Sequence, residues 1–218
     1  MLDFEPTTVL IFLGFIFSIV VHECAHGLVA HWCGDDTAVQ LGRITLNPIS
    51  HIDPVMSILL PGFLLMASHG QWAFGGAKPV PVNPFNLRNP KRDMMWVAWA
   101  GPMSNVILAI GFALLGNVAF LVLRSDPAFG MSLLHVVVGL VSVNLLLAGF
   151  NLIPVPPLDG SKILAGLLPR DMAASLMRLE PYGMLIVGAL VFSGATAHLL
   201  WPVGYAADWM LKTLIFIH

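Results

Sequence analysis

The chain has 218 residues, of which 57% are hydrophobic and only 10% are charged, and its net charge is -2. Because a soluble domain has about 25% charged residues, this composition leaves too little polar surface to coat a globule in water. It predicts an integral membrane protein. No basic tract points to nucleic acid as a partner, and two cysteines are too few for a disulfide framework.

Long apolar stretches recur along the chain. A helix needs about 20 apolar residues to cross a bilayer. Four stretches meet this requirement: 8–33, 94–123, 131–153 and 182–201. Two shorter stretches are compatible with a re-entrant or tilted segment (55–67) and with an interfacial helix (209–217). We therefore expect an all-α polytopic membrane protein with four to six transmembrane or re-entrant helices.

The polar region after the first span contains short patterns typical of extended chain. "VQLGRITLNP" (39–48) and "KPVPVNP" (78–84) are each bounded by turn residues. Such patterns predict small membrane-associated β-strands near 39–48 and 75–84. An exposed strand edge is one way in which a protein binds an unwound peptide.

Lysine and arginine are concentrated in two connecting regions. Residues 34–93 carry five of them and residues 154–181 carry three, whereas the segment before the first span carries none. In a multi-pass protein of the cell membrane, this bias predicts that both regions are cytoplasmic and that the N-terminus is outside. The prediction requires that 55–67 does not cross. It also brings residues 22–26 and 151–160 to the same, cytoplasmic, side of the membrane.

The first apolar stretch contains "HECAH" at residues 22–26, which fits H-E-x-x-H. On a helix, His22 and His26 lie one turn apart on one face, so both imidazoles can bind one Zn²⁺ ion. Glu23 lies beside them, where its carboxylate can take a proton from the attacking water. A chance match on a solvated helix is the alternative. Apolar flanks weigh against it, because ionisable residues inside a membrane segment are costly and usually functional.

Catalytic zinc usually has three protein ligands, so a third residue is required. Asp159 follows the third span in "NLIPVPPLDG", where prolines break the helix and Gly160 permits a close approach. Broken backbone at membrane depth is tolerated where it is buried in protein or lines a wet cavity. Asp159 is the best third ligand, with helix N-capping as its alternative role. His51 and Asp53 are the other candidates.

Together these motifs resemble those of the site-2 protease family of intramembrane zinc metalloproteases. The family's N-x-x-P-x-x-x-x-D-G motif and its G-P-x-x-N motif are both present, as Asn151, Pro154, Asp159 and Gly160 and as Gly101, Pro102 and Asn105. "GGAKPVPVNP" (75–84) is also similar to the small bacterial-type members. The resemblance spans roughly residues 10–170.

The resemblance implies one Zn²⁺ per chain, held by His22, His26 and Asp159, with Glu23 as the catalytic base. The implied activity is hydrolysis of a peptide bond in or near a transmembrane helix of another membrane protein, within the lipid bilayer. A divalent-metal carrier and a catalytically silent membrane regulator of the same fold are the alternatives.

Two asparagines are further candidates for the site. The resemblance suggests that Asn151 helps to hold the substrate backbone or the oxyanion, and Asn105 is the second candidate. Amide donors can stabilise a tetrahedral intermediate. For both residues, hydrogen bonding between helices is the alternative.

We expect one membrane-embedded protease domain over residues 1–218, with a catalytic core at about 8–170 and C-terminal helices at 182–218. Some members of the family carry an inserted PDZ domain. Residues 106–150 are nearly all apolar helix, so we expect no PDZ domain within this stretch. The sequence leaves the oligomeric state open.

Overall fold

The computed structural model describes residues 5–67, 69 and 75–215. Helices make up most of this part of the chain: α1 (Pro6–Trp32), α2 (Thr37–Gln40), α3 (Leu60–Ala67), α4 (Pro90–Ser125), α5 (Pro127–Asn151), α6 (Asp159–Leu167), α7 (Arg170–Met177), α8 (Gly183–Phe192) and α9 (Ala195–Leu214). Short turns of other helical types lie between them: η1 (Pro48–His51), η2 (Pro54–Leu59), η3 (Pro84–Asn86) and η4 (Glu180–Tyr182).

In the part of the chain that the structure describes, four helical stretches are long and apolar enough to cross a membrane: Pro6–Trp32, Pro90–Ser125, Pro127–Asn151 and Arg170–Phe192. The first three contain most of the predicted spans 8–33, 94–123 and 131–153. The prediction of one continuous helix over 182–201 is wrong. It is interrupted at Gly194, whose φ of 73° lies in the left-handed region that favours glycine, so α8 ends at Phe192 and α9 starts afresh.

The predicted strands near 39–48 and 75–84 are also wrong, because the described residues contain no strand. Residues 75–83 run as extended chain without a partner strand. Pro79 and Pro81 lack the N–H group that a ladder needs, and several other backbone groups of this segment bond to side chains instead. Residues 39–48 contain the end of α2, a turn around Gly42 and irregular chain.

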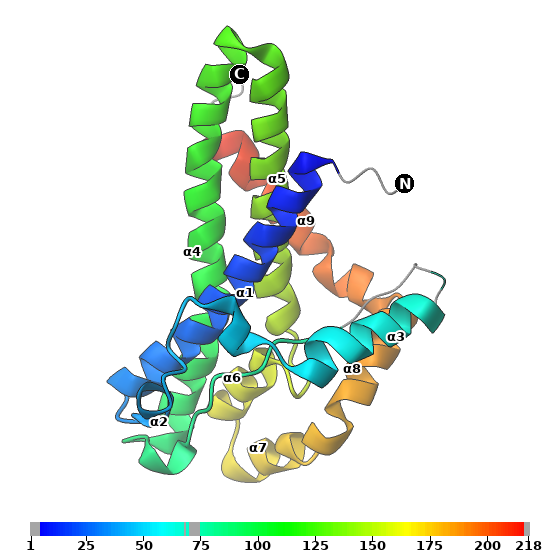
Figure 1. Cartoon of the computed structure of the whole chain (residues 1–218). Coiled ribbons are helices and arrows are strands. Elements are labelled where there is room, and N and C mark those ends of the chain that lie inside the picture. The colour runs from blue at the N-terminus through cyan, green and yellow to red at the C-terminus, as the bar shows by residue number, and fades with distance from the viewer. Residues whose placement is uncertain (1–4, 68, 70–74, 216–218) are drawn as a thin grey trace.

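Helices α4 and α5 form a long antiparallel hairpin (Figure 1). Asp126 connects them and caps α5, since its side chain accepts a hydrogen bond from Phe129 N at 3.1 Å. The hairpin is tight: a Cβ at Gly130 would lie 2.3 Å from the Cα of Leu123. Further along the pair, small and branched apolar residues form a core that α9 completes: Ala109, Ala113, Val137, Val141, Leu145, Ala207 and Met210. Small residues let membrane helices approach closely.

Helix α1 packs across this hairpin, and α6 packs against the lower part of α4 (Figure 1). Helix α4 therefore contacts both elements that carry the predicted metal ligands. Segment Pro54–Ala67, which comprises η2 and α3, is apolar but short. At 1.5 Å per residue it would extend about 21 Å, less than the roughly 30 Å of a hydrocarbon core.

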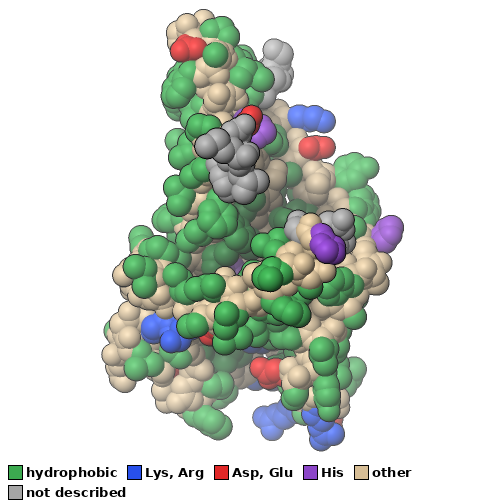
Figure 2. Space-filling view, turned by 45° about the vertical axis from the view of Figure 1, so that its right-hand side comes forward, with side chains coloured by type: hydrophobic (Ala, Val, Ile, Leu, Met, Phe, Trp, Pro, Cys, Tyr) green, Lys and Arg blue, Asp and Glu red, His purple; other side chains and the backbone are tan. Residues whose placement is uncertain are grey.

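The outer surface is largely apolar. Figure 2 shows hydrophobic side chains over most of the visible face, with Lys and Arg gathered mainly toward its lower end. Phe12 on α1 and Leu121 on α4, for example, are 59% and 64% exposed. Exposed apolar faces on helices of this length indicate contact with lipid.

Candidate metal centre

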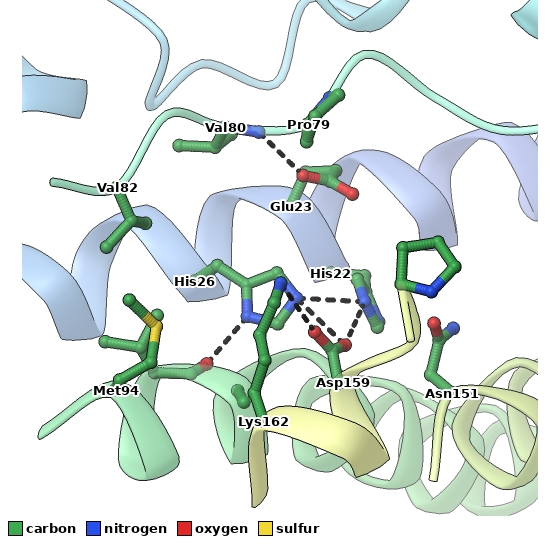
Figure 3. A pocket seen from close by; sticks show the side chains of 13 residues that line it. His22, Glu23, His26, Pro79, Val80, Val82, Met94, Asn151, Asp159 and Lys162 are labelled. Carbon is green, nitrogen blue, oxygen red and sulfur yellow. Dashed lines mark hydrogen bonds and ion pairs between the residues drawn. The ribbon is translucent and has the colours of Figure 1, made fainter. Parts of the chain in front are cut away.

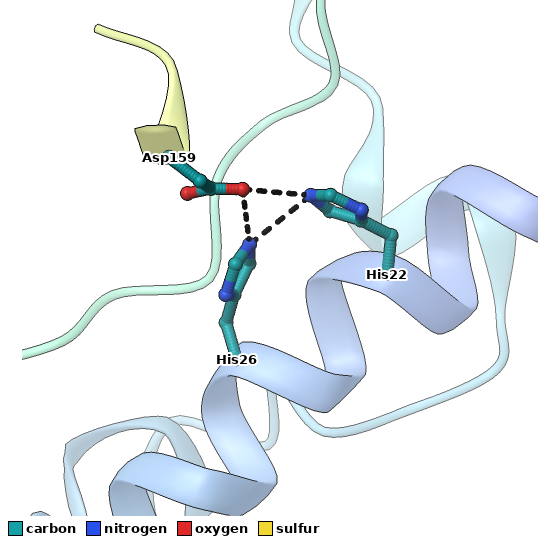
Figure 4. A group of neighbouring side chains, drawn as sticks. All are labelled: His22, His26 and Asp159. Atoms are coloured by element: carbon teal, nitrogen blue, oxygen red, sulfur yellow. Dashed lines mark hydrogen bonds and ion pairs between the residues drawn. The ribbon is translucent and has the colours of Figure 1, made fainter. Parts of the chain in front are cut away.

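His22, His26 and Asp159 converge on one point (Figures 3 and 4). Nε2 of His22 and Nε2 of His26 each lie 3.2 Å from Oδ2 of Asp159, and the two nitrogen atoms lie 3.1 Å apart. All three residues are buried. The structure thus joins two positions on α1 to one at the start of α6.

The local fold explains this convergence. The two imidazoles lie one helical turn apart on α1 and meet edge to face, with ring centroids 4.7 Å apart. After α5, the proline-containing loop turns the chain back and α6 begins at Asp159. Gly160 makes the turn possible, because a Cβ there would lie 2.2 Å from the carbonyl oxygen of Leu152.

Both imidazoles are oriented by hydrogen bonds to α4. Nδ1 of His26 donates to the carbonyl oxygen of Val97 at 2.7 Å. Nδ1 of His22 lies 2.6 Å from Oδ1 of Asn105. The amide nitrogen of Asn105 donates to Ser18 O at 3.3 Å and to Asn144 Oδ1 at 3.1 Å, which leaves its oxygen as the acceptor for His22. Because each Nδ1 carries a hydrogen, the neutral form of each imidazole presents a lone pair at Nε2.

The acceptor Asn105 belongs to a buried network across three helices. Asn144 on α5 donates to Ser18 Oγ at 2.9 Å and to Leu140 O at 2.9 Å, and Ser18 is on α1. Asn105, Asn144 and Ser18 are fully buried. Such a network fixes how α1, α4 and α5 meet, since hydrocarbon offers no water as a substitute partner.

This donor set fits a zinc ion. When both imidazoles are neutral, two Nε2 lone pairs and one carboxylate oxygen face a common centre, and a cation there satisfies all three. Ligand atoms about 2.0–2.1 Å from a tetrahedral zinc ion lie about 3.3–3.4 Å from each other. The observed separations of 3.1–3.2 Å are close to that geometry.

A cavity of about 280 Å³ adjoins His22, His26 and Asp159 (Figure 3). Its lining combines these three residues with Glu23 and Lys162, the amide of Asn151, and an apolar wall that includes Val80, Val82 and Met94. This volume is several times the roughly 30 Å³ that a water molecule occupies in the liquid.

Glu23 faces the extended segment of residues 75–83. Its Oε2 accepts a hydrogen bond from Val80 N at 2.8 Å, and Figure 3 shows it beside Pro79 and Val80. The segment is held on one side by the guanidinium of Arg43, which donates to Lys78 O at 3.1 Å. The segment is therefore a fixed wall of the cavity despite having no strand partner.

Asp35 holds the other end of the same segment. This buried carboxylate accepts hydrogen bonds from Asn83 N at 2.6 Å, Asn86 Nδ2 at 3.0 Å and Thr37 N at 3.1 Å. Burial opposes its ionisation, but the hydrogen bonds, first those from Thr37 and Asn86, outweigh burial and lower the pKa of Asp35. The carboxylate is thus charged at neutral pH and ties the end of α1 to the wall of the cavity.

The other predicted candidates are not part of the group formed by His22, His26 and Asp159. Nε2 of His51 donates to Thr45 O at 2.9 Å, and Asp53 caps η2, so neither joins the ligand group. Asn151 lines the cavity and donates to Leu147 O at 3.0 Å. Asn105 reaches the centre only through the imidazole of His22.

Sequence reasoning did not single out Lys162, which also lines the cavity. Its spacing of three residues from Asp159 was the available signal, because that spacing places two side chains on one face of a helix.

Comparisons with known proteins agree that the chain is similar to zinc metalloproteases. Peptidase family M50 matches residues 10–124 and 121–193. YwhC of Bacillus subtilis, named as a candidate zinc metalloprotease, is 40% identical over 86% of this chain and 82% of its own length. Rip2 of Mycolicibacterium smegmatis, named in the same way, is 31% identical over 89% of this chain and 71% of its own length. Zinc metalloprotease MJ0392 of Methanocaldococcus jannaschii is 25% identical over 83% and 43%. No solved structure gives a significant match.

Gly101→Ala should abolish zinc binding. A Cβ at Gly101 would lie 2.5 Å from Nε2 of both His22 and His26, so the imidazoles must move. The measurement is zinc per chain by mass spectrometry of the purified protein. Gly111→Ala on the same helix is the matched control, because its Cβ would meet nothing within 4 Å. Equal zinc content in the two variants would contradict the placement of the imidazoles.

Asn105→Leu should weaken zinc binding by about 10–100-fold, because it removes the acceptor that orients His22. The affinity is measured by competition with a chelator of known strength. Asn117→Leu, at the far end of α4, removes an amide of the same size away from the centre and should leave the affinity unchanged. An unaltered affinity in Asn105→Leu would show that the hydrogen bond does not orient the ligand.

Proposed function

Because the chain belongs to peptidase family M50, the site-2 protease family, we propose that this membrane metalloprotease hydrolyses a peptide bond in or near a transmembrane helix of another membrane protein. The observation that carries the proposal is the burial of His22 and His26, on the apolar helix α1, together with Asp159 beside a cavity that Glu23 also lines.

His22, His26 and Asp159 are the zinc ligands in this proposal. Zinc in such a site polarises the scissile carbonyl and lowers the pKa of a bound water to about 7. Glu23 takes a proton from the attacking water and returns it to the leaving nitrogen. The Val80 N–H group holds one oxygen of Glu23, so the carboxylate is positioned before substrate arrives.

The substrate must be locally unwound, because a helix engages its carbonyl groups in its own hydrogen bonds. The extended segment around Val80 and Val82 runs along the cavity and offers a surface beside which an extended peptide can lie. The apolar wall suits a substrate segment that comes from lipid. We assign Asn151 to holding the substrate backbone, since its side chain lines the same cavity.

We place the site at the cytoplasmic side of the cell membrane. The basic region 34–93 follows α1, which carries His22 and His26, and the basic region 154–181 contains Asp159, so the positive-inside rule favours an N-terminus outside. Residues 1–218 act as one protease domain in this proposal.

Glu23→Gln should lower proteolysis by about 10²–10⁴-fold, the range for loss of a general base, and should keep zinc. The assay follows cleavage of a reporter with one transmembrane helix, reconstituted with the protein in liposomes. Glu180→Gln, an exposed carboxylate on η4, is the matched control and should cleave like the wild type.

The same assay separates the alternatives. Cleavage that persists in Glu23→Gln would contradict the assignment of the base. Zinc transport into the liposomes without cleavage would instead indicate a metal carrier, and zinc binding with neither activity would indicate a silent regulator.

A further inference from the structure

Lys162 projects into the cavity from the same face of α6 as the ligand Asp159. Its Nζ lies 3.8 Å from Oδ1 of Asp159, and its side chain is 37% exposed. Among the described side chains that line the cavity, it is the one lysine or arginine. Figure 3 shows it rising from α6 alongside Asp159 toward His26.

The backbone of α6 around Lys162 is held rigidly. Its neighbour Ser161 is fully buried and donates from Oγ to Leu158 O at 2.7 Å, and Ile163 on the other side is buried as well. Gly160 fits against the backbone of the preceding loop. The helix therefore presents Lys162 to the cavity in one orientation, and only the flexible stem of the lysine can adjust.

The hydrogen-bonding capacity of Lys162 remains available to a substrate. A separation of 3.8 Å from Asp159 exceeds the 2.7–3.2 Å of a normal hydrogen bond. The other two polar candidates in the cavity differ in this respect. Glu23 is an acceptor that already bonds to Val80 N, and Asn151 has no charge and already uses one of its two amide hydrogens to donate to Leu147 O.

We propose that Lys162 is a catalytic residue whose ammonium group stabilises the oxyanion of the tetrahedral intermediate. The inference rests on the proposed function. When the water oxygen adds to the scissile carbon, the carbonyl electron pair moves onto the carbonyl oxygen, and one water proton goes to Glu23. The oxyanion then collapses, the C–N bond breaks, and that proton passes to the leaving nitrogen. Lys162 keeps its own proton throughout.

An ammonium group at this position acts selectively on the transition state. The carbonyl oxygen of the bound substrate carries only a partial charge, whereas the oxyanion carries a full one. The interaction strengthens as the reaction proceeds, so it raises kcat with little effect on KM. Loss of one such donor costs about 10²–10³-fold in kcat in well-studied enzymes.

The test compares Lys162→Met, Lys162→Arg and the control Lys91→Met in the liposome assay. Lys91 donates to Leu168 O and lies outside this cavity. Lys162→Met should lose about 10²–10³-fold in kcat with KM within a few-fold of wild type. Lys162→Arg, which keeps a charged donor, should recover part of the loss. Zinc content should equal that of wild type in all three variants.

A second readout does not depend on turnover. A phosphinic peptide places a charged tetrahedral group where the oxyanion forms. Its affinity should fall in Lys162→Met by a factor similar to the loss in kcat. A purely structural role for Lys162 would not produce that match.

Each other outcome overturns the inference. Unchanged kcat in Lys162→Met excludes the catalytic role. A rise in KM alone makes Lys162 a binding residue for an acidic substrate, and a loss of zinc makes it a support for Asp159. If the wild type itself fails to cleave, the proposed function fails and this inference falls with it. Wild-type cleavage with an unaffected Lys162→Met overturns the inference alone.

Discussion

Two imidazole N–H groups inside an apolar helix need acceptors, and both acceptors are on α4. Nδ1 of His22 bonds to Asn105 at 2.6 Å and Nδ1 of His26 bonds to Val97 O at 2.7 Å. Hydrocarbon supplies no water to replace either partner, so an unmade bond would cost several kcal/mol. These bonds fix the rotation and depth of α1 against α4. The Nε2 atoms of the two imidazoles consequently point toward Asp159 at the start of α6.

The same requirement explains the residues around the site. Helix α4 passes close enough to accept from both imidazoles only because Gly101 has no side chain facing them. Its amide at Asn105 is then satisfied by Ser18 and Asn144, which brings α5 into register with α1. Since α5 leads directly into the loop before Asp159, the polar network that orients one ligand also sets the starting point of the segment that carries another.

The structure brings together the three side chains that the sequence predicted as zinc ligands, His22, His26 and Asp159. Helical spacing alone places His22 beside His26. The need for a third ligand left His51 and Asp53 open beside Asp159, and the family resemblance favoured Asp159. The extended wall was misjudged as a strand, because Asp35 and Arg43, more than 30 residues away, satisfy its backbone groups. The break at Gly194 depends on a left-handed φ that hydropathy does not report.

The charged groups of the cavity occupy opposite walls. Glu23 lies on the wall formed by α1 and the segment at Val80, whereas Lys162 comes from α6 beyond the ligand group (Figure 3). In the proposed mechanism, a peptide bond between these walls would meet Glu23 as the proton acceptor on one side and the ammonium group of Lys162 on the other. The two groups would act at different atoms of the substrate, so neither would have to move for the other to act. The apolar lining limits competing water, which strengthens both electrostatic effects on the substrate.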